Sequence, residues 1–134
     1  MAWKRIIFFI FLFSVSSEAA ELNFKKIADF RSPWGSTFVS NNEILLTEVS
    51  GNLKLINIES GSITEVKHNL KVLEDGQGGL LDILYNNNYI YVSYSEDRGN
   101  GKTSTSIAKG VFNTKEIIFK NIFRAEPPLS LIHI

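Results

Sequence analysis

The sequence contains no cysteine, which excludes a disulfide framework, a thiolate metal site and a lipid-modified N-terminal cysteine. It also has no excess of either charge, because 14 basic and 14 acidic residues balance and the basic ones are scattered. Without a basic patch the chain has little with which to hold a phosphate backbone, so we expect no nucleic-acid partner. No window of helical length keeps apolar residues at i, i+3, i+4 and i+7, so the pattern does not predict helices.

Residues 1–19 have the order of an export signal. Lys4 and Arg5 form a small basic region, and Ile6–Phe13 is an unbroken apolar stretch. Ser17 and Ala19 place small residues at the two positions that a signal peptidase reads. The apolar stretch is far shorter than the roughly 18 residues that a membrane-spanning helix needs. We predict cleavage after Ala19, release into the periplasm or the medium and no membrane span thereafter; an uncleaved N-terminal anchor is the alternative.

From residue 20 onward the chain reads as short β-strands separated by turn residues. The predicted strands are Glu43–Glu48, Leu53–Ile58, Ile63–Val66, Leu80–Tyr85, Tyr89–Tyr94, Ser104–Phe112 and Glu116–Phe123. They form two groups of about four strands, and this spacing is close to the roughly 40–50 residues of one propeller blade. Periodicity alone leaves a β-propeller and a β-sandwich open.

Three short motifs suggest a binding site, but each lacks residues that the site would need. Gly101-Lys102-Thr103 ends like a phosphate-binding loop, yet the earlier glycine is missing and no helix follows, so we predict a hairpin tip. His68 and His133 lie far apart without an acidic or cysteine partner at ligand spacing, so we expect no zinc site. Glu96-Asp97 lacks the alternating oxygen ligands of a calcium loop, and we predict a turn there.

The segment Asp75–Asp82 is different, because it contains three glycines within four positions. Glycine contributes nothing to packing and is used where the backbone bends sharply or approaches a neighbour closely. Gln77 is the one long polar side chain among them, and its amide both donates and accepts. It precedes an apolar strand, as a loop-borne ligand contact does. An ordinary glycine-rich connection between two strands is the alternative.

Several of these stretches together are similar to one family. The segments that carry the similarity are Pro33–Gly35, Glu43–Glu48, Gly51–Leu53 and, above all, Gly76–Asp82 with its Gly-Gln-Gly-Gly-Leu-Leu-Asp string. Tyr89–Ser95, Ser106–Gly110 and Ile122–Arg124 continue it in the same order. From about Phe30 to Pro128 the chain resembles the soluble aldose sugar dehydrogenases of the glucose/sorbosone dehydrogenase family, which use pyrroloquinoline quinone (PQQ).

The resemblance implies an all-β fold, a six-bladed β-propeller of which residues 20–128 supply roughly the first two to three blades. It also implies oxidation of an aldose at the anomeric carbon to the lactone, with PQQ, helped by Ca²⁺, passing electrons to an acceptor. Gln77 corresponds to a glutamine that lines the sugar pocket beside PQQ. A non-catalytic exported binding or scaffolding domain of propeller type is the alternative function.

The family's catalytic histidine has no counterpart that we assign. In the family it follows the Phe-Arg and Pro-Pro region within a glycine-rich His-Phe-Gly stretch. His133 lacks the glycines and the aromatic residue, and residues 129–134 read as a tail that departs from the family. The basic residues that hold PQQ and the calcium ligands are expected further along a family chain, so we assign no metal ligand. We therefore expect this fragment by itself to be inactive.

Overall fold

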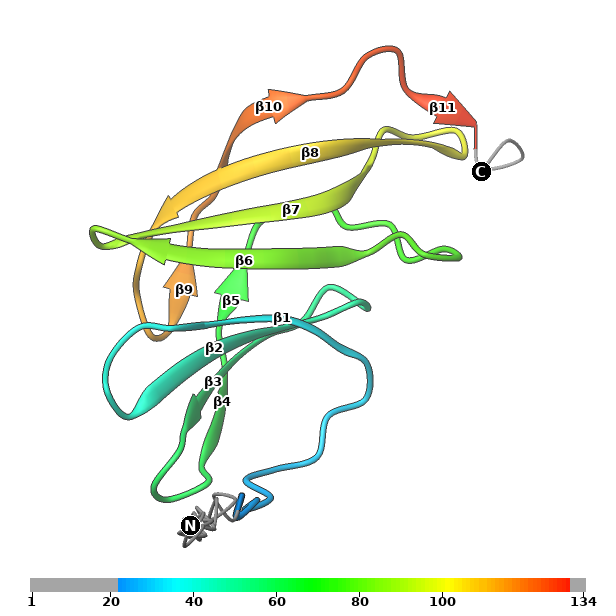
Figure 1. Ribbon diagram of the computed structural model, residues 1–134. Helices are drawn as coiled ribbons and strands as arrows, with labels where there is room; N and C mark the ends of the chain where they lie inside the picture. Colours follow the sequence, from blue (N-terminus) through cyan, green and yellow to red (C-terminus); the bar gives the residue numbers. More distant parts are fainter. Residues whose placement is uncertain (1–21, 131–134) are drawn as a thin grey trace, which may run out of the picture.

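The computed structural model describes residues 22–130, and all regular elements within this range are β-strands. The first sheet is antiparallel and contains, in spatial order, β1 (Pro33–Phe38), β2 (Glu43–Glu48), β3 (Leu53–Asn57) and β4 (Ile63–Glu65). The second is built from β6 (Leu80–Asn86), β7 (Tyr89–Asp97), β8 (Lys102–Val111), β10 (Lys120–Arg124) and the short β11 (Leu129–Ser130). A parallel pair, β5 (Lys67–His68) and β9 (Glu116–Ile117), lies between them (Figure 1). The all-β prediction and the two groups of strands are confirmed.

Two local predictions are wrong. The stretch Glu116–Phe123 is not one strand but two, because β9 pairs with β5 whereas β10 pairs with β8. Between them Phe119 turns its ring into the core, and its main-chain N–H and C=O bond instead to the side chain of Asn69. Glu96-Asp97 is not a turn either, since β7 continues through Asp97 and buries Glu96.

The core lies between the two sheets. Each sheet turns one face toward the other, and strand alternation places apolar side chains on that face. Leu45 and Leu55 from the first sheet are buried together with Ile83, Val92 and Ala108 from the second. β1 is the edge strand of the first sheet and β6 that of the second, and these two strands contact each other and lie side by side (Figure 1). We call this side of the two sheets the inner edge.

Thr47 joins the two sheets by hydrogen bonds at this inner edge. It is fully buried; its hydroxyl accepts from the N–H of Gly35 at 2.9 Å and donates to the carbonyl oxygen of Leu81. A side chain at Gly35 would be crowded, because its Cβ would lie 3.0 Å from the same carbonyl oxygen. One hydroxyl therefore satisfies buried main-chain groups of both sheets.

The part of the chain that the structure describes contains no helix able to cross a bilayer. The predicted signal peptide at 1–19 lies outside these residues, as does His133.

We expect Thr47→Val to lower the free energy of unfolding by about 2 kcal/mol, because it leaves two buried main-chain groups without a partner. Thr47→Ser is the matched control, since it keeps the hydroxyl and removes only a methyl group, worth about 1 kcal/mol. Urea unfolding at one fixed protein concentration measures both. A valine variant as stable as the serine variant would contradict the role given to the hydroxyl.

Candidate functional site

The loop that carries Gln77 runs from Leu73 to Gly79, and one residue of β7, Ser95, bonds to both of its ends. The carbonyl oxygen of Ser95 accepts from the N–H of Leu73 at 2.9 Å, and the N–H of Ser95 donates to the carbonyl oxygen of Gly79 at 2.8 Å. Within the loop, the N–H of Gly78 donates to the carbonyl oxygen of Asp75 at 2.7 Å. The loop is therefore tied to the sheet on either side of Gln77.

The glycines of this loop have distinct physical reasons. Gly76 has φ +54°, a left-handed backbone that a side chain disfavours. Gly79 is needed for close approach, because a Cβ there would overlap the carbonyl oxygen and the side chain of Val49. At this point the N–H of Leu80 donates to the carbonyl oxygen of Val49 at 3.0 Å, which joins the loop to the first sheet.

Gln77 itself is exposed, and none of the hydrogen bonds among the described residues uses its amide. It lines a cavity of about 550 Å³, a volume typical of ligand pockets. The other lining residues are Leu73, Asp75, Gly76, Gly78, Leu81, Ser95, Thr103 and Thr105. We call this the Gln77 cavity. It offers an amide, a carboxylate and several hydroxyls, and none of its lining residues is basic.

Sequence reasoning missed the residues that share the cavity with Gln77. Ser95 and Thr105 face each other across β7 and β8, on the side of the second sheet that points away from the first sheet. A signal for them exists in the sequence, because alternation in β7 places Ser93 and Ser95 on one face of the strand. Only the sheet register shows that this face adjoins the Gln77 loop.

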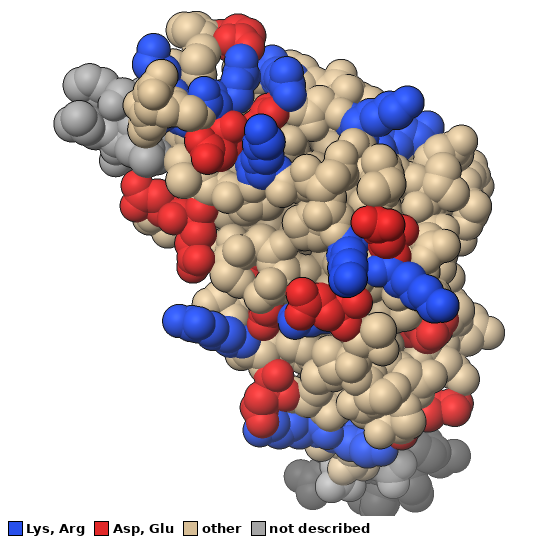
Figure 2. Space-filling view, turned by 180° about the vertical axis from the view of Figure 1, so that it is seen from behind, with Lys and Arg blue, Asp and Glu red and all other residues tan. Residues whose placement is uncertain are grey.

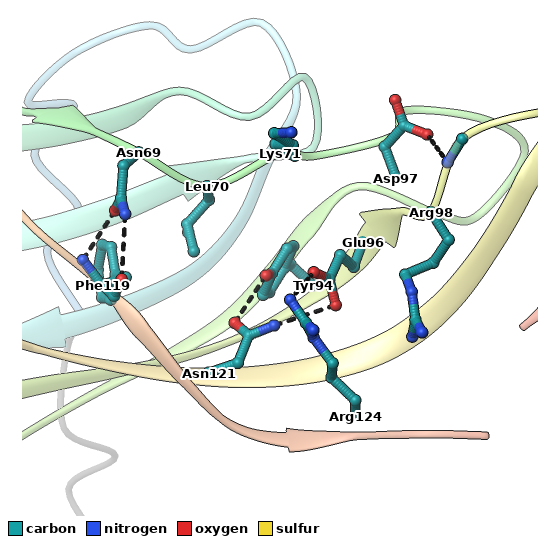
Figure 3. Close-up of a pocket in the computed structure, with 11 residues that line it drawn as sticks. Asn69, Leu70, Lys71, Tyr94, Glu96, Asp97, Arg98, Phe119, Asn121 and Arg124 are labelled. Carbon is teal, nitrogen blue, oxygen red and sulfur yellow. Dashed lines mark hydrogen bonds and ion pairs between the residues drawn. The ribbon is translucent and has the colours of Figure 1, made fainter.

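A second cavity, of about 560 Å³, lies between the ends of β7 and β10 (Figure 3). Its polar groups largely bond one another. Buried Glu96 accepts from Ser106 at 2.6 Å, from Asn121 at 3.0 Å and from Arg124 at 2.6 Å. Asn121 in turn accepts from the hydroxyl of Tyr94 at 2.8 Å, and burial raises the pKa of this phenol. The cluster fastens β10 onto β7 and β8, which is a structural role.

The charged groups of the molecule are mixed in sign. On the face shown in Figure 2, Lys and Arg side chains alternate with Asp and Glu, and no continuous basic surface appears there. Within residues 22–130 no group of three or more His, Asp or Glu side chains is arranged to hold a metal ion. His68 bonds the carbonyl oxygen of Gly51 at 2.7 Å and packs edge-on against Phe119. It is a structural residue.

Comparison with known proteins identifies the family. The sequence profile of the Glucose / Sorbosone dehydrogenase family matches residues 30–132, most of the chain. The chain belongs to this family. No curated protein matches it significantly.

Solved structures of the family share its fold. A crystal structure of a glucose dehydrogenase is 29% identical, with a TM-score of 0.68 over 74% of this chain and 31% of that one. The soluble aldose sugar dehydrogenase of Escherichia coli, solved in its apo form, is 28% identical, with a TM-score of 0.67 over 75% of this chain and 31% of that one. The PQQ-bound aldose sugar dehydrogenase of Streptomyces coelicolor is 18% identical, with a TM-score of 0.67 over 77% and 33%.

This chain therefore spans about a third of the length of these solved relatives. Its two antiparallel sheets correspond to two blades of a β-propeller, as the resemblance implies. The Gln77 loop enters the inner strand of the second blade, β6, directly.

Glu48 supports the turn that meets the Gln77 loop. It is buried, and its carboxylate accepts from the side chain of Asn52 at 2.8 Å and from the N–H of Arg31 at 3.1 Å. The hydrogen bond from Asn52, with the second from Arg31, holds the pKa of the Glu48 carboxyl below its ordinary value. The next residue, Val49, makes the contact with Gly79.

We expect Gly79→Ala to destabilise the fold by about 1–3 kcal/mol, because the added methyl group overlaps main-chain atoms of Val49 that cannot move freely. The control is Gln77→Ala in the same loop, which should leave the melting temperature almost unchanged because that side chain is exposed. Thermal unfolding of the two variants provides the comparison. Equal melting temperatures would show that the close approach at Gly79 is not required.

Glu48→Gln should reduce stability at neutral pH and make it less sensitive to acid. The folded-state pKa lies below the unfolded value of about 4.3, so the carboxylate stabilises the fold above that value. The contribution is lost as the pH falls through the folded-state pKa. Urea unfolding from pH 7 downward should show wild type and variant converging, whereas exposed Glu116→Gln should follow wild type throughout. A constant difference between wild type and Glu48→Gln would contradict this.

Proposed function

We propose that this chain forms the sugar-contacting wall, around Gln77, of an exported PQQ-dependent aldose dehydrogenase. The observation that carries the proposal is the loop itself. Gln77 is the one side chain within the glycine stretch Gly76–Gly79, and this stretch ends a loop that the main chain of Ser95 ties at both ends. Such a loop presents one amide in a reproducible position while leaving space beside it.

The chemistry of the Gln77 cavity suits a polyhydroxylated ligand. An amide donates to one sugar hydroxyl and accepts from another, and the hydroxyls of Ser95 and Thr105 add further donors and acceptors. The side chain of Leu81 offers an apolar surface for C–H groups. Because Gln77 touches the sugar and not the transferred hydrogen, its role is to orient the anomeric carbon.

The same residues do not suit the carboxylate groups of PQQ. None of the residues that line the Gln77 cavity is basic, and Asp75 would repel a carboxylate. We expect the groups that hold PQQ, the calcium ligands and the base that removes the anomeric proton to come from other blades of the propeller. The described residues thus contribute substrate orientation, and we assign to them no part in the oxidation step.

The product of this proposal is the lactone, and the electrons pass to an acceptor that we do not identify. The predicted signal at 1–19 supports action outside the cytoplasm. The alternative function is a non-catalytic exported binding or scaffolding domain. Such a domain would use the same Gln77 cavity to bind a ligand but would not oxidise it. Measured turnover therefore separates the two.

The test needs the rest of a propeller. We propose a chimera in which residues 30–130 replace the matching segment of the Escherichia coli aldose sugar dehydrogenase. Loaded with PQQ and Ca²⁺, it should oxidise an aldose with an artificial electron acceptor. Gln77→Ala should lower kcat/KM roughly tenfold, since a lost sugar hydrogen bond costs about 1 kcal/mol or more. The melting temperature should hardly change.

Glu74→Ala is the matched control, because Glu74 is an exposed neighbour that does not line the cavity, and it should keep full activity. If Gln77→Ala keeps its kcat/KM while its melting temperature falls, Gln77 is structural. A folded chimera that binds PQQ but does not oxidise any aldose would overturn the proposed function as a whole.

A further inference from the structure

Asp75 is the one charged side chain among the residues that line the Gln77 cavity, and it precedes Gln77 by two positions. Two main-chain hydrogen bonds pair it with Gly78. The N–H of Gly78 donates to the carbonyl oxygen of Asp75 at 2.7 Å, and the N–H of Asp75 donates to that of Gly78 at 3.3 Å. Gly76 and Gln77 form the turn between them. The carboxylate of Asp75 and the amide of Gln77 thus belong to one small unit in the wall of the cavity.

The carboxylate of Asp75 has no partner within the part of the chain that the structure describes. No side-chain hydrogen bond and no ion pair among residues 22–130 uses it. The basic side chains of the neighbouring strand ends, Lys71, Arg98 and Arg124, line the second cavity instead (Figure 3). These residues therefore leave a negative charge on the wall of the Gln77 cavity.

A charge on a bound sugar would lie within the range of this carboxylate. A cavity of about 550 Å³ is roughly 10 Å across, which is about one Debye length at physiological ionic strength. At such separations two unit charges in a largely solvated site change a binding constant by about two- to fivefold. A protonated amine on the sugar is attracted and a carboxylate is repelled, whereas a neutral sugar experiences neither effect.

We propose that Asp75 sets the charge preference of the sugar site, favouring aldoses that carry a protonated amine and disfavouring acidic aldoses such as uronic acids. The inference rests on the proposed function, because that function places the sugar in the Gln77 cavity. It concerns the contribution of Asp75 alone. Residues elsewhere in a propeller are the same in wild type and variant, so their effects divide out when the two are compared.

The test uses the chimera described above with glucose, glucosamine and glucuronate. For each charged sugar, kcat/KM is divided by the value for glucose, at a mildly acidic pH at which the amine carries its proton. Asp75→Asn keeps the shape of the side chain and removes its charge. It should lower the glucosamine ratio and raise the glucuronate ratio, each by about two- to fivefold. Added salt should reduce both changes, because it screens the charges.

Two further variants separate a charge at the cavity from other effects. Asp75→Glu keeps the charge and should keep both ratios close to those of wild type. Glu74→Gln is the matched control, because it removes the same charge from an exposed neighbour that does not line the cavity, and both ratios should hardly change. The melting temperature of each variant verifies its fold, and Asp75→Ser replaces Asp75→Asn if the asparagine variant does not fold.

The outcomes distinguish this inference from the proposed function. If the chimera oxidises glucose but Asp75→Asn leaves both ratios unchanged, or moves them in the same direction, the role of Asp75 is wrong and the proposed function stands. An equal change in Glu74→Gln would also contradict it, since the charge of the whole loop would then act.

If the chimera oxidises no aldose, the proposed function fails and binding tests Asp75 instead. Dissociation constants for the three sugars, from saturation-transfer NMR titrations without PQQ, should show the same opposite changes on Asp75→Asn. Constants that do not change, or a chimera that binds none of the sugars, would overturn the inference.

Discussion

The whole arrangement depends on how closely the two sheets approach at their inner edge. The blades of a propeller are arranged radially around one axis, so the inner strands of neighbouring blades lie nearer to each other than the outer strands do. Here that approach brings main-chain groups of both sheets into one buried place, where water cannot satisfy them. The hydroxyl of Thr47 satisfies two of them, and the absence of a side chain at Gly35 and Gly79 lets the backbones meet. A larger residue at Gly79 would overlap the main chain of Val49 and push the sheets apart, and one at Gly35 would crowd the main chain of Leu81 and Asp82.

The same contact positions the candidate site. The N–H of Leu80 bonds to Val49 of the first sheet, while Gly79, one residue earlier, bonds to Ser95 of the second. The strand that begins here is thus held from two directions, and Gln77 precedes it by only a few residues. Because main-chain hydrogen bonds anchor the loop, the exposed Gln77 side chain is not needed to hold it and can contact a ligand. Main-chain groups of Leu73 and Gly79 therefore stabilise the loop, and the side chain of Gln77 is available to bind.

A buried carboxylate holds the edge strand β10 on the second sheet. Glu96 sits on the inward face of β7 and collects hydrogen bonds from β8 and β10. An unpaired charge there would be costly, and the pairing with Arg124 and Asn121 makes its burial possible. The cluster keeps the outermost strand in place where few apolar contacts are available. The polar groups of this second cavity thus bond largely to one another, unlike Gln77 in its cavity.

The sequence alone determined the strands and their grouping, because alternation and turn residues act locally. Strand β2 has the predicted bounds, and the predicted strand Tyr89–Tyr94 lies within β7. The glycine string also indicated Gln77, since glycines without packing value are informative wherever they cluster. The resemblance to the family depended mainly on the same string, and the family profile confirms it.

Tertiary structure decided the points at which partners distant in the sequence compete with local pattern. Asn69 captures the main chain of Phe119 and divides one predicted strand into two. Arg124 and Asn121 allow Glu96 to be buried, where its sequence neighbourhood indicated a turn. Likewise, only the register of β7 with β8 brings Ser95 and Thr105 to Gln77. Local patterns predict which residues form strands, but the energetic cost of a buried charge or an unpaired amide depends on partners that the fold alone brings near.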